Sequence, residues 1–262
     1  MSTQNTVCRD NEEQKEPRGL IAIPEITSMI SGNPKELIEQ FRLHVTVVVD
    51  DSSSIQDCRN TADIIAWHND TLASLSALPH ADAIYWRTRF LTAHSLRGKH
   101  VSVREAPRLH EGNYHPIHDT PLYDSACKKL ISVAKQQSRN EYLSQKDRYM
   151  TLFLSDGADT ASRTYSADDS ARLAEKMLKT EKHIISGMGV HDGSTDFSQV
   201  FQSMGIPPQW IYTINRSREG FQRGSEVTSG SVGSASFGSE SFSSMSQGGF
   251  TSAPDSSDSS VH

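Results

Sequence analysis

The sequence has few cysteines and no long apolar run. Its three cysteines, Cys8, Cys58 and Cys127, are too few and too odd in number for a disulfide framework, which favours a reducing compartment. No stretch approaches the roughly 18 apolar residues that a membrane span requires, and residues 1–20 lack the apolar segment of a secretory signal. We therefore expect a cytoplasmic protein that does not bind membranes.

A positive charge excess is missing as well. The formal net charge of the 262 residues is -6 at pH 7, which argues against general nucleic-acid binding. Hydrophobic residues make up 35% of the chain and its mean hydropathy is -0.53, which is low for a chain packed from end to end. We expect one domain of ordinary size with unpacked ends.

The two ends of the chain lack the pattern of a packed core. Residues 1–19 are polar and charged, which predicts a disordered or loosely attached arm, and residues 20–40 form a lead-in segment. At the other end, residues 216–224 are expected to form a terminal helix or linker. Residues 225–262 hold fifteen serines and five glycines, which predicts a disordered tail whose removal after Gly224 costs little stability.

Between these ends, strand-like and helix-like patterns alternate over residues 41–215. Short apolar runs predict strands at 45–49, 84–91, 100–104, 150–154, 184–190 and 210–214. Apolar residues at helical spacing predict helices at 64–78, 122–134, 167–178 and 197–204. The alternation predicts an α/β fold, with a doubly wound, mostly parallel sheet covered by helices on both faces. Such a sheet binds ligands at the carboxyl ends of its strands.

Oxygen-bearing side chains follow two of these strands and precede one helix. Asp50, Ser52 and Ser54 come directly after the first strand and fall on one side of an extended loop. Thr120 precedes the helix that begins near residue 122, and Asp156 follows the strand at 150–154. Carboxylate and hydroxyl oxygens are hard ligands, which predicts a site for Mg2+, with Mn2+ or Ca2+ as alternatives.

Three motifs in this order resemble a known family. They are D-x-S-x-S at 50–54, T-P-L-Y-D-S at 120–125 and S-D-G-A-D at 155–159. Together they resemble the metal-ion-dependent adhesion site of von Willebrand factor A (vWA) domains, over about residues 41–215. Residues 156–163 are most similar to the small stand-alone cytosolic bacterial members. The sequence departs from the common pattern at Ser53 and Asp119, where glycine is frequent.

The resemblance implies both a ligand set and a kind of partner. It assigns the metal to Asp50, Ser52, Ser54, Thr120 and Asp156, with one coordination position left for an exposed Asp or Glu of a partner protein. The function expected is therefore metal-dependent protein–protein interaction without enzymatic activity. The partner, the pathway and the oligomeric state do not follow from the sequence.

Other interpretations of the same residues stay open at this point. Asp50, Thr120 and Asp156 are also suited to cap the helices that follow them. Three histidines, at positions 110, 115 and 118, offer a zinc site of unfamiliar spacing, and a polar loop is favoured instead. Gly187-x-Gly189 is either part of a phosphate loop or, as we favour, a place of close packing. Asp51 is expected to face solvent or to lie behind the ligands.

The alternative function is a divalent-metal-dependent phosphotransfer receiver or hydrolase. A receiver would need a phosphoacceptor Asp at residues 90–100, where none occurs. A dehalogenase-type hydrolase would need a second Asp where Ser52 stands, and neither a G-x-S-x-G elbow nor a P-loop is present. The sequence therefore favours a binding module.

Overall fold

Strand β1 (Arg42–Val49) lies in the interior of a six-stranded sheet, ordered β3-β2-β1-β4-β5-β6. This computed structural model describes residues 42–92, 96, 98–141, 147–237 and 250. The other strands are β2 (Ile84–Phe90), β3 (Val101–Ser102), β4 (Asp147–Ser155), β5 (His183–Val190) and β6 (Ile211–Ile214). All neighbouring strands are parallel except β2 and β3, which pair antiparallel. The predicted α/β class is therefore confirmed.

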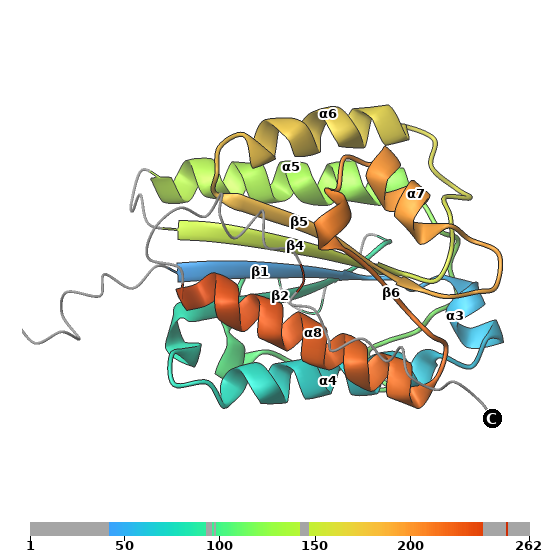
Figure 1. The fold of residues 1–262 in the computed structure, drawn as a ribbon, viewed down its shortest axis with the longest axis horizontal. Coiled ribbons are helices and arrows are strands. Elements are labelled where there is room, and N and C mark those ends of the chain that lie inside the picture. Colours follow the sequence, from blue (N-terminus) through green and yellow to red (C-terminus); the bar gives the residue numbers. More distant parts are fainter. Residues whose placement is uncertain (1–41, 93–95, 97, 142–146, 238–249, 251–262) are drawn as a thin grey trace, which may run out of the picture. The chain divides into compact units, whose positions relative to one another are not determined.

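Helices cover both faces of the sheet (Figure 1). On one face lie α4 (Thr61–Ser76) and α8 (Arg218–Phe237), and on the other lie α5 (Leu122–Glu141), α6 (Ala167–Leu178) and α7 (Phe197–Ser203). The short helices are α3 (Ser53–Asp57), η1 (Ala81–Ala83), η2 (Val103–Glu105) and η3 (Pro208–Trp210). Within the described ranges, no helix has both the length and the apolar character needed to cross a bilayer.

Strand β1 is buried on both of its faces because parallel sheets are covered by helices on each side. Its β-branched residues, from Val45 to Val49, therefore form the middle of the core. The two glycines of β5 serve close packing: a methyl group on Gly187 would overlap the ring of Phe201, and one on Gly189 would overlap Phe197. The close-packing interpretation of this Gly-x-Gly pair is confirmed.

The tail boundary predicted at residue 225 is wrong. Helix α8 continues to Phe237 and packs along α4, and its residues Val227, Thr228 and Val232 are buried. Further along, the amide of Phe250 donates to the carbonyl of Gln209 at 2.9 Å. The arm at 1–19, the lead-in segment at 20–40 and the tail residues 238–249 and 251–262 lie outside the described residues.

Small side chains explain why the composition of this segment was misleading. Serine and glycine are poor helix formers on average, but Gly224 and Ser225 of α8 lie against residues of α4 and let the two helices approach closely. A Cβ atom on Gly224 would lie 3.2 Å from the Sδ of Met188 and 3.4 Å from Trp67. The hydroxyl of Thr71 on α4 donates to the Ser225 hydroxyl at 3.1 Å. Composition averages over the segment and does not show which face each serine occupies.

A chain that ends at Gly224 should therefore be much less stable than the full chain. It loses the buried valines of α8 and uncovers α4, so we expect its melting temperature to fall by roughly 10 °C or more. Thermal denaturation followed by circular dichroism measures this effect, with a chain ending at Thr251 as the control that keeps α8. Equal melting temperatures for the Gly224 chain and the full chain would contradict the packing of α8.

Candidate metal site

The pairing of β1 with β4 places two loops side by side at the carboxyl edge of the sheet. Val49 is in register with Leu154, so Asp50 follows the end of β1 beside Ser155, the last residue of β4. The Asp50 carboxylate is fully buried and accepts two hydrogen bonds, from the Ser52 amide at 2.9 Å and the Ser155 hydroxyl at 2.6 Å. Ser155 was not among the residues expected at the site, although it stands next to Asp156 in the sequence.

A chain of hydroxyl groups joins the first loop to the second. Ser52 Oγ lies 2.8 Å from Ser54 Oγ, and the Ser54 hydroxyl donates to Asp156 Oδ1 at 2.7 Å. Ser52, Ser54, Thr120 and Asp156 all line one cavity of about 540 Å³, and Asp50 contacts Ser52 from the protein interior. The structure thus brings together all five residues that the sequence nominated.

Asp156 has an oxygen atom that the protein does not satisfy. Its Oδ2 is buried and accepts no hydrogen bond from the described residues. Burial raises the pKa of Asp156, and it raises the pKa of Asp50 to about 6, although hydrogen bonds from Ser155 and Ser52 act in the opposite direction. A cation would compensate both desolvated carboxylates. The set of two carboxylates and three hydroxyls fits a hard divalent ion such as Mg2+.

The helix-cap alternative does not explain these carboxylates. Helix α6 begins eleven residues after Asp156 and is capped by Ser166, whose hydroxyl accepts from the amide of Asp169. The N-cap position of α3 is occupied by Ser52 rather than by Asp50. The ends of β1 and β4 therefore determine where both carboxylates lie, and helix capping does not.

The described part of the chain does not support the zinc alternative at His110, His115 and His118. It contains no group of three or more His, Cys, Asp or Glu side chains placed to share an ion, and the five nominated residues include only two such side chains. A larger hollow, of about 630 Å³, lies along α6. It is lined by side chains of both charges, such as Asp168 and Arg172. None of the five nominated residues lines it.

Comparison with solved structures finds the same architecture elsewhere. No protein-family model and no curated protein matches the sequence. The PilB minor pilin from Streptococcus sanguinis matches with a TM-score of 0.54 at 10% identity, over 74% of this chain and 62% of that chain. The pilus adhesin SpaC from Lactobacillus rhamnosus GG, in its open conformation, has a TM-score of 0.54 at 11% identity, over 74% and 30%.

A third similar structure, the SpRpn10 VWA domain, matches with a TM-score of 0.42 at 11% identity, over 70% of this chain and 93% of that chain. The two pilus proteins, each with a TM-score of 0.54, share the α/β architecture of this chain. At these identities the likeness concerns the fold alone, and this chain spans less than two thirds of either pilus protein.

Asp51 supports the loop at residues 50–54 from inside the protein. It is 3% exposed, so the expectation that it faces solvent is wrong, and the expectation that it lies behind the ligands describes it better. Its carboxylate accepts the amide of Thr92 at 3.1 Å and also the Thr92 hydroxyl. The backbone of His118 pairs with the same loop, because its carbonyl accepts from Ser53 at 2.8 Å and its amide donates to Asp51 at 3.1 Å. This pairing fixes the segment that carries Thr120.

The two departures from the family pattern lie at the opening of the site. Asp119 and Ser53 are both exposed, and both line the cavity. Neither side chain makes a hydrogen bond or an ion pair with a described residue. Asp119 therefore places an additional negative charge at the rim of the cavity.

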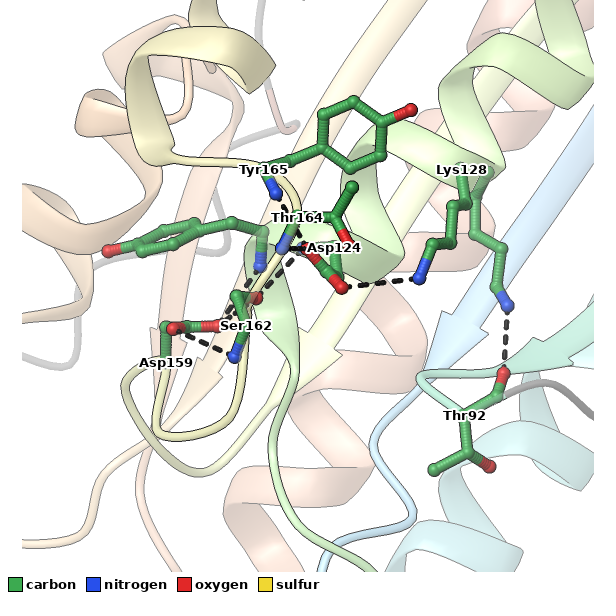
Figure 2. Close-up of polar contacts among 9 residues, drawn as sticks. Thr92, Asp124, Lys128, Asp159, Ser162, Thr164 and Tyr165 are labelled. Carbon is green, nitrogen blue, oxygen red and sulfur yellow. Dashed lines mark hydrogen bonds and ion pairs between the residues drawn. The ribbon is translucent and has the colours of Figure 1, made fainter.

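The N-terminus of α5 is bonded to the loop that follows Asp156 (Figure 2). The Thr160 amide donates to the carbonyl of Thr120 at 3.0 Å. In the first turn of the helix, the buried carboxylate of Asp124 accepts the amides of Thr164 at 2.9 Å and Tyr165 at 2.8 Å, and the Lys128 ammonium at 3.2 Å. Burial alone would raise the pKa of Asp124, but these hydrogen bonds outweigh it and lower the pKa to about 2.

A second carboxylate in the same loop completes this connection. Asp159 accepts the amide of Tyr123 at 3.2 Å and the hydroxyl of Ser162 at 2.5 Å, and Ser162 in turn accepts the amide of Asp124 at 2.8 Å (Figure 2). The loop thereby satisfies the N–H groups of Tyr123 and Asp124 at the start of α5. Sequence reasoning missed Asp124, although it belongs to the T-P-L-Y-D-S motif, because its partners lie 40 and 41 residues away.

Substitution of Asp124 by Ala should loosen this connection. It leaves two backbone amides without their charged acceptor, which costs about 2 kcal/mol and lowers the melting temperature by roughly 4–8 °C. Because Thr120 and Asp156 are held by the joined segments, we also expect weaker Mg2+ binding. Thermal denaturation and calorimetric titration measure the two effects. Lys128→Ala removes only an exposed partner and serves as the control, and an Asp124→Ala protein as stable as this control would contradict the assignment.

Proposed function

We propose that this chain is a non-enzymatic module that binds a partner protein through a divalent cation. Asp50, Ser52, Ser54, Thr120 and Asp156 would hold the ion, which we expect to be Mg2+, with Mn2+ or Ca2+ as alternatives. The observation that carries this proposal is the buried Oδ2 of Asp156, which lacks a hydrogen-bond donor beside a row of hydroxyl groups. Buried carboxylate oxygens are otherwise hydrogen-bonded or bound to metal.

The donor set also supports an acidic partner. Three of the five side chains are neutral hydroxyls, so the ion stays electrophilic and gains from an added carboxylate. The cavity is open to solvent, and exposed Arg216 lines it and lowers the pKa of Asp156 through its positive charge. An Asp or Glu side chain of a partner protein would therefore be attracted toward the ion.

Loss of either carboxylate should abolish metal binding without unfolding the domain. Asp156→Asn keeps the shape of the side chain and removes the charge that the ion compensates, so we expect no Mg2+ binding in calorimetric titration. Asp57→Asn, which changes an exposed acid of α3 outside the cavity, is the matched control. If the Asp156→Asn protein binds Mg2+ with unchanged affinity, the site is wrongly assigned.

Partner binding should depend on both the ion and Thr120. Thr120 lies two residues before the first residue of α5, so its hydroxyl can approach or leave the ion when that helix shifts. We expect Thr120→Ala to weaken partner binding about tenfold, or about 1.4 kcal/mol, and Thr120→Ser to change little. Proteins captured on the full chain in Mg2+ and in EDTA are identified by mass spectrometry, and their affinities for the two variants are then measured. Equal partner affinity in Mg2+ and EDTA would disprove recognition through the metal.

The alternative functions have less support. The receiver alternative needs a phosphoacceptor Asp at residues 90–100, but β2 ends in Phe90 and is followed by Leu91 and Thr92, and residues 90–100 contain no Asp. Metal-assisted hydrolysis is favoured by one observation: His118 lines the cavity, and its Nε2 lies 4.0 Å from a buried Asp51 oxygen. Hydrolysis of a phosphate ester that requires both Mg2+ and His118 would favour an enzyme over a binding module.

A further inference from the structure

Strand β2 carries two arginines on the face of the sheet that points toward α5. Trp86 and Thr88 point to the other face, where both contact His68 of α4. Because side chains alternate along a strand, Arg87 and Arg89 lie opposite them, on the side covered by α5 (Figure 1). Both arginines are half-buried.

A lysine from α5 joins these two arginines. Lys129 is 3% exposed, and its ammonium donates to the carbonyl of Thr92 at 2.8 Å; Thr92 is labelled in Figure 2. Burial, followed by the positive charge of Arg89, lowers the pKa of Lys129 to about 8. Burial and the charge of Arg87 lower the pKa of Arg89 to about 10. The three cations therefore lie close enough to repel one another.

The arginines lack partners for atoms that solvent does not reach. Nε of Arg87 and both Nε and Nη1 of Arg89 are buried, and within the described ranges they donate to no acceptor. Asp51 favours the charged form of Lys129, but its carboxylate accepts the hydroxyl and amide of Thr92 and no hydrogen bond from either arginine. Buried guanidinium nitrogen atoms without acceptors destabilise a fold, and a neutral polar residue would serve the sheet better.

We propose that Arg87, Arg89 and Lys129 form a binding site for a phosphate group. None of the three lines the metal-site cavity, so this site is separate from the proposed function. Guanidinium groups present planar, paired N–H donors that match the oxygens of a phosphate. A phosphate dianion compensates the mutual repulsion of three cations better than a singly charged carboxylate does. The phosphate belongs either to a free ion or to a phosphorylated protein segment.

The test is calorimetric titration of the full chain with inorganic phosphate and, separately, with O-phosphoserine. EDTA is present throughout, so that phosphate cannot bind through a metal ion, and chloride keeps the ionic strength constant. We expect inorganic phosphate to bind and Arg89→Gln to weaken it about tenfold or more. Arg139→Gln, an exposed arginine on the same helix as Lys129, is the matched control and should bind as the unmodified chain does. If O-phosphoserine binds at least as tightly as inorganic phosphate, the site is assigned to a phosphorylated protein segment. If O-phosphoserine binds more weakly than inorganic phosphate, the site is assigned to the free ion.

The melting temperature measured in chloride, without phosphate, distinguishes a ligand-binding role of Arg89 from a structural role. Removing one of three repelling charges should leave the melting temperature of Arg89→Gln equal to or above that of the unmodified chain. A large fall would assign Arg89 to the fold and overturn the proposal. If this variant does not fold, Arg87→Gln is measured in the same way. The proposal is also overturned if phosphate does not bind, if Arg89→Gln binds it with unchanged affinity, or if acetate binds as tightly as phosphate.

Discussion

The parallel pairing of β1 with β4 is the constraint on which the candidate metal site depends. Because Val49 and Leu154 are in register, the chain leaves the sheet twice at one point, and each exit carries a buried carboxylate. Hydrogen bonds from Ser155 and Ser54 orient Asp50 and Asp156, respectively, but they leave the Asp156 Oδ2 without a donor. The core of the sheet therefore determines where negative charge accumulates and which oxygen atom is available to an ion.

The elements were predictable from the sequence where their cause is local. The valines before Asp50 and the apolar spacing at 122–134 each indicate an element without knowledge of the rest of the chain. The five nominated residues were predictable because each lies next to the end of such an element. The roles of Asp51 and Asp124 were not, since their partners Thr92 and Thr164 are brought to them only by the complete sheet. The continuation of helix α8 beyond residue 224 was missed because composition averages over its two faces.

Charge is segregated in this molecule in a way that the net value of -6 conceals. Desolvated carboxylates gather at the carboxyl edge of the sheet, and desolvated cations gather between β2 and α5. Thr92 contacts both groups: its amide and hydroxyl bind Asp51, while its carbonyl accepts Lys129. A single backbone position therefore separates two regions of opposite electrostatic potential.

The close approach of α8 to its neighbours restricts substitution in a segment that its composition would mark as permissive. At Gly220 even a methyl group would overlap the carbonyl of Asn215, and at Gly224 it would press on Met188 and Ile214. Serines such as Ser225 and Ser231 are buried at the same helix face, so larger residues would force α8 away from the sheet. Variation among related sequences should therefore be narrowest at these small residues and wider at Glu226 and Ser234, which are exposed.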